Sequence, residues 1–580
     1  MQPANKIFAR RGPMLTAAAL AAVLAGWALS AVLPTYLVYL ATTAIISSIA
    51  LLGLGVVTGT AGMIVLCQLT LAAVGAWVVS WLNVLGVPGG LFVWLPAAGL
   101  VAGIAGVIIG LPALRLRGVN LAVVTLGFAA AADLTLVKTQ FPGAVNGTKV
   151  PRPELFSTDR GYFFLAVIVL VLVGATVHLL QHSRWGSGWR SVAFSERGTA
   201  SAGSSVRTAK LSAFAVSSAI AGLAGGLIAG QVGTAFPSGF NTLQSMALYV
   251  LSIVAGAHLL EMAVFGGVLW VLIPELLKRW GIPQDWGFVV FGAMGIQALT
   301  SNSNLGQDIR NAVRRRRRRE SGPPAAVLVP LAAAVAAEAK AATEGKALLK
   351  VKDLTVEFGQ ITALANVDIT VAEGTIVGLI GPNGAGKSTF VDAISGFLPQ
   401  HSGEVWLGAD RLDGLAPHQR ARIGLRRTFQ QDRVPPSLTV YDYMNFIARR
   451  SASGEEIAGI LEFFGCPGPG VQISTVDVGT RRILEVAANI AAKPRLLVLD
   501  EPAAGLSHDE HIAFGQRLRL VPQRYRTAIL IIEHDLDLVR SVCDYVTVLD
   551  FGEVLATGRQ DEVLADPSVL KAYMGETELI

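Results

Sequence analysis

The stretch TIVGLIGPNGAGKSTF (375–390) decides the fold of the second half of this 580-residue chain. Its apolar run TIVGLI (375–380) is typical of a buried strand, and FVDAISGF (390–397) is typical of a helix. The segment between them, GPNGAGKS (381–388), fits the pattern G-x-x-x-x-G-K-S. A glycine loop in this strand–loop–helix context predicts an α/β fold that binds phosphate groups at the amino end of a helix.

The pattern gives each part of the loop a role. Backbone N–H groups wrap the phosphates, Lys387 reaches the terminal phosphates, and the Ser388 hydroxyl binds Mg²⁺. The nucleotide-binding residues predicted for the loop are Gly381, Pro382, Asn383, Gly384, Ala385, Gly386, Lys387, Ser388 and Thr389.

Two further apolar runs end in ionisable residues. LLVL (496–499) is followed by Asp500 and Glu501, and AILII (528–532) is followed by Glu533 and His534. Parallel strands place ligands at their carboxyl ends, so these residues are expected at one edge of a sheet. Asp500 would then orient Mg²⁺, and Glu501 would polarise the attacking water. His534 is placed at the same edge, although a lone histidine is more often structural.

Composition separates this half of the chain from the other. The whole chain is 52% hydrophobic and only 15% charged, against about 25% charged in an average soluble protein. Residues 1–300 hold 16 Lys and Arg and 7 Asp and Glu, only 23 of the 88 charged residues. These numbers exclude a disordered chain and a secreted enzyme, and three cysteines do not make a disulfide framework. The net charge of +6 fits an anionic membrane surface and suggests no nucleic-acid partner.

The first half contains about ten candidate membrane spans, each of which needs about 20 apolar residues. A retained first span is favoured over a signal peptide because more apolar segments follow it. Positive residues at 115, 117, 184–210 and 314–319 place both chain ends in the cytoplasm. The candidate spans are 14–33, 36–57, 61–82, 92–114, 119–138, 162–180, 210–232, 243–260, 262–277 and 286–300.

Three features of this half allow more than one interpretation. The glycine-rich stretches 55–62 and 220–230 indicate tight packing or, alternatively, backbone that unwinds beside a cavity. Asp133 lies inside an apolar run and is either a hydrogen-bonded structural residue or a substrate contact. The basic loop 184–209 is expected to contain a short helix that docks on the soluble domain, with an ordinary solvated loop as the alternative.

The domain boundaries follow from these shifts in composition. A transmembrane permease domain is expected over 1–305 and an α/β nucleotide-binding domain over 348–580. Between them, residues 306–347 read as a basic, Ala- and Pro-rich cytoplasmic linker. Its arginine run either attracts anionic headgroups or only fixes the topology.

Several segments of the chain resemble a known protein family. Residues 348–580 resemble the nucleotide-binding domain of ABC transporters, and the whole chain is similar to a fusion of permease and ATPase from the branched-chain, or hydrophobic, amino-acid uptake branch. The segments that carry the resemblance are RRTFQQ (426–431), LDEPAAGL (499–506), IIEHDLDLV (531–539), LRLRGVNLAVVTLGF (114–128) and AKLSAFAVSSAIAGLAGGLIA (209–229).

The resemblance implies further roles. Gln430 would sense both Mg²⁺ and the membrane subunit, and His534 would contact the γ-phosphate. Phe358 would stack on adenine, with a core aromatic as the alternative. Such domains work as dimers that hold two ATP molecules at their interface, each against the signature loop of the opposite subunit.

The signature loop departs from the family pattern. Where LSGGQ, or LAYGQ in this branch, is expected, the chain has VDVGT (476–480), which puts Asp477 at the position that should donate to the γ-phosphate. A carboxylate about 4 Å from a phosphate charge would repel it by about 4 kcal/mol at an effective dielectric of about 20. The defect falls on the partner's ATP, so an asymmetric pair with a second permease–ATPase unit is expected.

The resulting expectation is an ATP-driven importer half in the plasma or inner membrane, with its ATPase domain in the cytoplasm. The resemblance implies a small hydrophobic amino acid or related amide or organic acid as substrate and an extracytoplasmic substrate-binding protein as partner. Two alternatives stay open: an exporter or lipid-moving pump, and a regulatory half that binds ATP with little hydrolysis.

Overall fold

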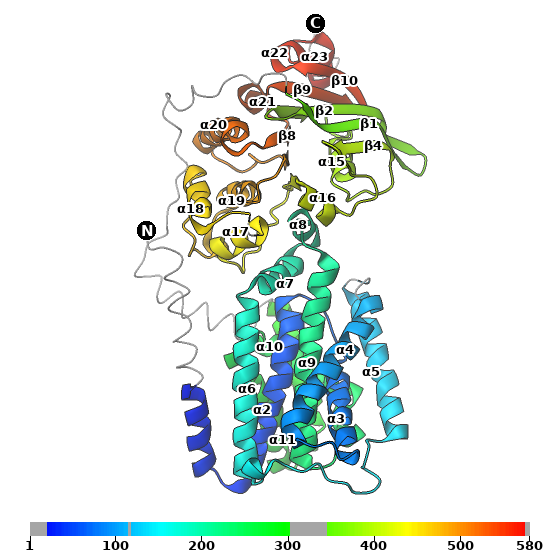
Figure 1. Ribbon diagram of the computed structural model, residues 1–580, viewed down its shortest axis with the longest axis vertical. Coiled ribbons are helices and arrows are strands. Elements are labelled where there is room, and N and C mark those ends of the chain that lie inside the picture. The colour runs from blue at the N-terminus through cyan, green and yellow to red at the C-terminus, as the bar shows by residue number, and fades with distance from the viewer. Residues whose placement is uncertain (1–19, 114–115, 117, 302–344, 450, 575–580) are drawn as a thin grey trace. The chain divides into compact units, whose positions relative to one another are not determined.

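The computed structural model describes residues 20–113, 116, 118–301, 345–449 and 451–574 (Figure 1). The chain divides into two compact units, one within residues 1–189 and 207–322 and the other within 190–206 and 323–580. The arginines at 115, 117 and 314–319 and nearly all of the predicted linker lie outside the described residues. The predictions that rest on them therefore stay predictions.

The first unit is a bundle of helices, as expected from its apolar runs. After a helix at Leu20–Val32, the elements are α2 (Thr35–Gly55), the π-helical turn η1 (Val56–Thr60), α3 (Gln68–Val84), α4 (Gly90–Ala113), α5 (Val119–Thr139), η2 (Glu154–Phe156), α6 (Asp159–Gln181), α9 (Val206–Val232), η3 (Pro237–Phe240), α10 (Thr242–Ala255), α11 (Leu260–Arg279) and α12 (Trp286–Ser301). The helix α7 (Arg184–Phe194) begins in this unit and continues into the second one.

Six of the described helices are long and apolar enough to cross a membrane, and three shorter apolar helices accompany them. Each of the ten predicted segments contains a helix, but the predicted count of ten spans is not confirmed. The sequence windows run across breaks in the helices. Within the segment 243–260, for example, α10 ends at Ala255 because Gly256 takes a left-handed conformation with φ at 75°.

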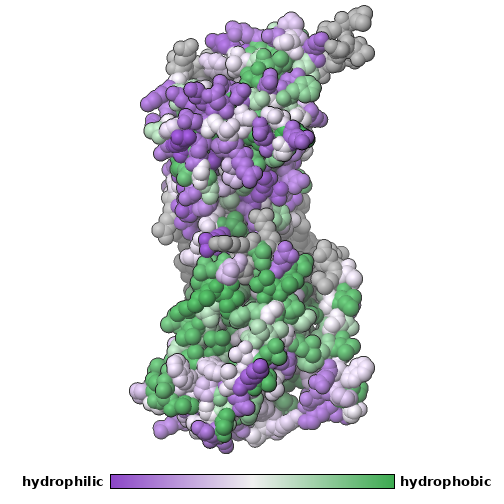
Figure 2. All heavy atoms as spheres, turned by 90° about the vertical axis from the view of Figure 1, so that its right-hand side faces the viewer, coloured by the Kyte–Doolittle hydropathy of each residue, from purple (hydrophilic) through white to green (hydrophobic). Residues whose placement is uncertain are grey.

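The outer surface of the bundle is apolar, as a lipid environment requires. Figure 2 shows hydrophobic side chains gathered over the helical unit, whereas hydrophilic side chains prevail over the α/β unit. Large exposed hydrophobic residues on α4 and α5 include Phe92, Val93, Leu100, Ile104, Ile108, Val123, Leu134 and Val137.

Glycines let the central helices approach one another closely. A Cβ atom on Gly225 of α9 would lie 1.8 Å from the carbonyl oxygen of Ala72 in α3. A Cβ atom on Gly75 would likewise lie 2.1 Å from the carbonyl oxygen of Gly222. Tight packing is therefore the correct interpretation of the stretch 220–230.

Asp133 has a structural place in α5. One carboxylate oxygen, Oδ2, accepts hydrogen bonds from the backbone amide of Thr242 at 3.1 Å and from the Thr242 hydroxyl at 3.3 Å. The half-buried carboxylate thus caps the start of α10, whose first amide groups need acceptors. Of the two interpretations of Asp133, the structure describes the hydrogen-bonded one.

The described residues of the second unit form two sheets. A six-stranded sheet has the order β10-β9-β3-β8-β7-β6, with β10 antiparallel and the other pairs parallel, and a four-stranded antiparallel sheet has the order β2-β1-β4-β5. The strands are β1 (Ala347–Phe358), β2 (Ile361–Ala372), β3 (Ile376–Ile380), β4 (Ser402–Leu407), β5 (Asp410–Arg411), β6 (Leu425–Arg427), β7 (Leu496–Asp500), β8 (Ala528–Ile532), β9 (Tyr545–Asp550) and β10 (Glu553–Arg559).

All five residues of β3, β7 and β8 are buried, which explains their continuous apolar sequences. Helices cover the six-stranded sheet, and an apolar core fills the space between them. The helical elements of this unit are α8 (Glu196–Ser201), α15 (Lys387–Ile394), α16 (Pro417–Ile423), α17 (Val440–Ala448), α18 (Gly454–Phe463), η4 (Ile473–Thr475), α19 (Val478–Ala491), α20 (His508–Tyr525), α21 (Leu536–Val542), α22 (Gln560–Val563) and α23 (Pro567–Met574). The expected α/β fold is confirmed.

Candidate functional site

The glycine loop joins β3 to α15, as the sequence predicts. Gly381 has φ at 149°, and a Cβ atom there would lie 2.1 Å from the carbonyl oxygen of Leu549. Gly386 caps α15 with φ at 98°, and a Cβ atom would lie 2.7 Å from the Leu364 side chain. Neither position accepts a side chain. The loop is a backbone cradle at a helix amino end, which suits phosphate oxygens.

Lys387 is held by this loop. Its Nζ atom donates hydrogen bonds to the carbonyl oxygens of Gly381 at 2.6 Å and Pro382 at 2.8 Å. Burial lowers the pKa of Lys387, and the carboxylates of Glu501 and Asp500 oppose that change. The lysine is therefore positioned at the phosphate cradle together with the two carboxylates.

The carboxyl ends of β6, β7 and β8 bring three of the predicted residues together. Glu501 follows β7 and takes a left-handed φ of 46°, and its amide donates to the carbonyl oxygen of Ile532 at 2.9 Å. Its carboxylate accepts a hydrogen bond from Gln430 Nε2 at 2.9 Å, and His534 Nδ1 lies 3.8 Å from the other carboxylate oxygen. The side chains of Gln430, Glu501 and His534 thus form one cluster.

Asp500 is tied to a chain of ion pairs. Arg427, on β6, pairs with Asp500 at 3.1 Å through Nη2 and with Asp392 of α15 through Nη1. Asp392 also pairs with Arg197 of α8 at 2.8 Å. These contacts connect α8 to the carboxylate at the end of β7 through alternating charges.

Burial raises the pKa of Asp500, although Arg427 opposes the rise. Burial also raises the pKa of Glu533 to about 7. Oxygen donors of this kind, a carboxylate, a hydroxyl and an amide, are the ligands that Mg²⁺ prefers. The donor set of Ser388, Gln430 and Asp500 therefore fits Mg²⁺, whose charge would favour the ionised form of Asp500.

Of the remaining predicted residues, Ser388 and Phe358 are exposed, whereas Ala385 of the loop is buried. Ser388 is exposed in the first turn of α15, and Thr389 is half-buried beside it. Phe358 is 52% exposed at the end of β1. An exposed ring excludes the alternative of a core aromatic, and adenine stacking stays a prediction.

Sequence reasoning missed Arg482, which lies in the first part of α19. It donates to the carbonyl oxygen of Gln430 at 2.6 Å through Nη2 and to that of Glu501 at 2.9 Å through Nη1. The guanidinium thus fixes the backbone of two site residues, and it belongs to the helix that follows the signature loop. The arginine pair in RRILEVA was visible in the sequence, but nothing in that pattern indicated where its side chains point.

The altered signature loop leads into α19. Asp477 is the residue before the first turn of that helix, and its Oδ1 accepts a hydrogen bond from the amide of Thr480 at 2.8 Å. Partial burial would raise the pKa of Asp477, but hydrogen bonds from Thr480 and from its own amide, together with the charge of Arg481, lower the pKa overall. The loop therefore presents an ionised carboxylate.

Residues 190–206 pack on the α/β unit as part of the same compact body. The carbonyl oxygen of Gly203 accepts a hydrogen bond from Arg422 at 2.9 Å and one from Arg449, and the carbonyl oxygen of Ser201 accepts one from Arg426 at 3.3 Å. Ala202 is fully buried in the core that includes α17 and α19. A docking helix in the loop 184–209 is thereby confirmed, in the form of α8.

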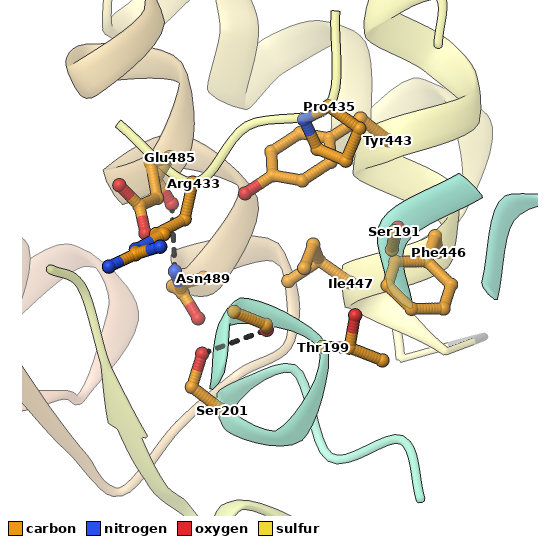
Figure 3. A pocket seen from close by; sticks show the side chains of 11 residues that line it. Ser191, Thr199, Ser201, Arg433, Pro435, Tyr443, Phe446, Ile447, Glu485 and Asn489 are labelled. Atoms are coloured by element: carbon orange, nitrogen blue, oxygen red, sulfur yellow. Dashed lines mark hydrogen bonds between the residues drawn. The ribbon is translucent and has the colours of Figure 1, made fainter. Parts of the chain in front are cut away.

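A cavity of about 10 Å³ lies beneath this contact. Figure 3 shows Thr199 and Ser201 of α8 facing side chains from α17 and α19, among them Tyr443, Glu485 and Asn489. Glu485 is only 4% exposed. Burial raises its pKa to about 8, the Asp432 carboxylate adds to the rise, and Arg482, Arg433 and Arg427 oppose it.

The buried carboxyl makes the stability of this unit depend on pH. The folded state holds a proton on Glu485 up to about pH 8, whereas the unfolded chain releases it near pH 4.5, so the free energy of unfolding falls as pH rises between these values. Because glutamine carries no proton to release, we expect Glu485→Gln to abolish this fall in the free energy of unfolding. A difference of one pKa unit between the folded and the unfolded chain changes the free energy of unfolding by about 1.4 kcal/mol. The midpoint temperature of the ATPase-domain transition of Glu485→Gln should therefore lie several degrees above that of the wild type at pH 8 and hardly above it at pH 5.

The measurement is thermal unfolding of the detergent-solubilised full chain from pH 5 to pH 9. Glu462→Gln, a change at an exposed position of α18, is the matched control and should leave the profile unchanged. If Glu485→Gln is no more stable than the wild type at pH 8, Glu485 does not hold a proton in the folded chain.

Each half of the chain matches known proteins. A family model described as the permease component of a branched-chain amino acid transport system matches residues 36–299, and an ABC transporter model matches residues 364–504. The chain is 32% identical over 250 residues to the high-affinity branched-chain amino acid transport ATP-binding protein BraF of Pseudomonas aeruginosa. It is 34% identical over 250 residues to the corresponding protein LivG of Escherichia coli. Each match covers 40% of this chain and 98% of the relative.

Among solved structures, the ADP conformation of an ATP-binding cassette of an ABC transporter is 27% identical. The match covers 40% of this chain and 100% of that one, with a TM-score of 0.36. The family of this chain is therefore assigned from the family models and the curated relatives. Cassettes of this kind are ATPases coupled to transport and lie on the cytoplasmic side of a membrane permease. The chain belongs to the ABC transporters, and it joins a permease component of the branched-chain amino acid type to an ATP-binding cassette in one polypeptide.

Proposed function

We propose that this chain is one permease–ATPase half of an importer that uses ATP to move a small organic solute, with a branched-chain or other hydrophobic amino acid, or a related amide or organic acid, as its substrate. The observation that carries the proposal is the cluster of Gln430, Glu501 and His534 beside the phosphate loop, in a chain whose other half matches a branched-chain amino acid permease. Relatives named for high-affinity transport of these amino acids support the substrate class.

The phosphate loop would bind ATP through its backbone amides. Lys387 would exchange its hydrogen bonds to the carbonyl oxygens of Gly381 and Pro382 for the terminal phosphates. Ser388, Gln430 and Asp500 would hold Mg²⁺, which neutralises phosphate charge when bound. Phosphoryl transfer to water needs mainly positioning and charge neutralisation, and these residues supply both.

Hydrolysis would take place at the ends of β7 and β8. Glu501 would polarise the water that attacks the γ-phosphorus, and His534 would contact the γ-phosphate. The oxygen of that water forms the new bond to phosphorus while the bond to the β-phosphate oxygen breaks, which yields ADP and phosphate. The Arg427 and Asp392 ion pairs would link Asp500 to α8, so that ATP-driven closure of two cassettes reaches the membrane helices.

We further propose that the functional dimer is asymmetric. Asp477 places a carboxylate where a γ-phosphate donor is needed, so two copies of this chain would carry the damaged loop in both ATP sites. A second permease–ATPase unit would supply a sound signature loop to the intact site here. An extracytoplasmic substrate-binding protein would deliver the solute. The same Asp477 also favours a second candidate, a regulatory half that binds ATP with little hydrolysis.

The test of import is solute uptake by the complete assembly in proteoliposomes. We expect Lys387→Ala to reduce ATP-dependent uptake of radiolabelled leucine by at least about a hundredfold, because removing one charge-stabilising group from such a site costs about 10²- to 10³-fold. Lys350→Ala, at an exposed position of β1, serves as the control and should transport normally. Uptake that survives Lys387→Ala would overturn the proposal, and outward movement of the solute would favour an exporter.

A further inference from the structure

The helix α2 does not lead directly into α3. It passes into the π-helical turn η1, and residues 62–67 that follow have no regular structure before α3 begins at Gln68. This stretch returns into the bundle, because Gln68 Nε2 donates to the carbonyl oxygen of Ala50 at 3.2 Å and Gln68 Oε1 accepts from Ser217 Oγ at 3.2 Å. Irregular backbone inside a membrane is tolerated only where it is buried in protein or lines a water-filled cavity.

A cavity lies at this break. Its volume is about 280 Å³, and it is lined by the end of α2 with η1, the irregular stretch, the carboxyl-terminal half of α10 and His258. This volume is close to the lower end of the range for ligand pockets, about 300–1,000 Å³. That room suits a small organic solute.

Two glycines in the cavity lining stand where a side chain would be disfavoured. A Cβ atom on Gly59 would lie 2.8 Å from the Cβ atom of His258, so any side chain there would collide with the imidazole wall. Gly62 takes a φ of 67°, which side chains rarely adopt. Both glycines are exposed, so they form the rim through which a solute would enter.

The lining has two chemical parts. Thr58 Oγ1 and Ser252 Oγ lie 3.3 Å apart and share a hydrogen bond, and Tyr249 and His258 add further polar atoms. Met63, Ile64 and Ile253 supply aliphatic surface. Hydroxyls beside aliphatic side chains are complementary to a solute that has a polar head and a short apolar body.

The lack of charged side chains in the cavity lining favours a solute without net charge. None of the described residues that line the cavity is Asp, Glu, Lys or Arg. A solute with a net charge would therefore lose its hydration without gaining an opposite charge, which is costly. In a neutral amide or a zwitterionic amino acid the net charge is zero, so this penalty is smaller.

The cavity lies toward the end of the bundle that leads to the ATPase. Gln181, the last residue of α6, donates through Nε2 to Thr60 Oγ1 at 3.3 Å and to the carbonyl oxygen of His258 at 3.0 Å. Only eight residues separate Gln181 from Arg190, where the segment that packs on the ATPase begins. A solute bound here is thus near the cytoplasmic end of its path.

We propose that this cavity is the inner substrate subsite of the permease and that it binds a net-neutral aliphatic solute, either a zwitterionic amino acid or an amide. Thr58 and Ser252 bind the polar head, and Met63, Ile64 and Ile253 contact the apolar body. The inference rests on the proposed transport function and narrows its substrate class by disfavouring organic anions.

The first test uses the reconstituted assembly and radiolabelled leucine. Thr58→Val and Ser252→Ala should each raise the KM for uptake about tenfold, the equivalent of one hydrogen bond, with kcat within about twofold of the wild type. Thr176→Val is a matched control because the Thr176 hydroxyl, like that of Thr58, donates to a carbonyl four residues earlier at 2.8 Å. An unchanged KM in both cavity variants would overturn the assignment.

The second test does not depend on transport. In the full chain in detergent, the thiol introduced by Ser252→Cys should react with N-ethylmaleimide, and leucine or acetamide should slow that reaction at least about threefold while benzoate should not. The thiol introduced by Ser238→Cys, at an exposed position before α10, is the control and should react at one rate throughout. If the wild-type assembly takes up no leucine, the proposed function alone is contradicted. If neither leucine nor acetamide slows the reaction of the Ser252→Cys thiol with N-ethylmaleimide, or if benzoate slows it, this inference is overturned.

Discussion

Glu501→Gln is expected to abolish nearly all ATP turnover while ATP binding persists. Glutamine has the shape of glutamate and retains a carbonyl oxygen that accepts the hydrogen bond from Gln430 Nε2, which lies 2.9 Å from the present carboxylate. It cannot polarise water as a carboxylate does. Since general-base catalysis contributes about 10²- to 10⁴-fold, we expect the ATPase rate to fall by at least a hundredfold.

The two consequences need separate measurements. The ATPase rate of the complete assembly gives turnover, and titration with a fluorescent ATP analogue gives binding, which should stay within about threefold of the wild type. Glu553→Gln, at an exposed position of β10, controls for the loss of one surface charge and should hydrolyse ATP normally. Substantial turnover by Glu501→Gln would move the role of general base to another residue, and lost binding would make Glu501 part of the ATP pocket itself.

Asp477→Ser is expected to increase ATP hydrolysis by the chain on its own. In a pair of identical copies, each Asp477 would repel a γ-phosphate by up to about 4 kcal/mol at 4 Å and an effective dielectric of about 20. That value is a ceiling of about a thousandfold in rate, and relaxation of the loop reduces it. We therefore expect a gain of at least about tenfold over the wild-type chain alone.

Folding should be preserved in this variant because serine is also a good residue at the start of a helix. It replaces the Asp477 carboxylate as acceptor for the Thr480 amide, now 2.8 Å away. Asp477→Asn removes the charge and retains the amide oxygen, so it separates the effect of charge from the effect of shape and should give most of the gain. Vigorous hydrolysis by the wild-type chain alone, or no gain from either variant, would contradict the asymmetric dimer.

The positions of the candidate ATPase residues in the fold could be predicted from the sequence. Gly381, Gly386 and Lys387 belong to one short contiguous pattern, and the residues at the ends of β7 and β8 follow short apolar runs, which form buried strands in the structure. Local patterns of this kind are decided by backbone geometry and burial over a few residues, and they survive without knowledge of the partners. The ten apolar segments of the permease were found for the same reason.

The tertiary structure decided what depends on contacts distant in the chain. Which apolar segments are complete spans is set by the breaks after α2 and α9, where packing and glycine conformation end a helix that hydropathy alone would continue. The assembly of Gln430 with Glu501 and of Arg427 with Asp392 and Asp500 joins residues 71, 35 and 73 positions apart. A side chain's partner across such a distance is fixed by how strands and helices pack, and that information is not present in any single stretch of sequence.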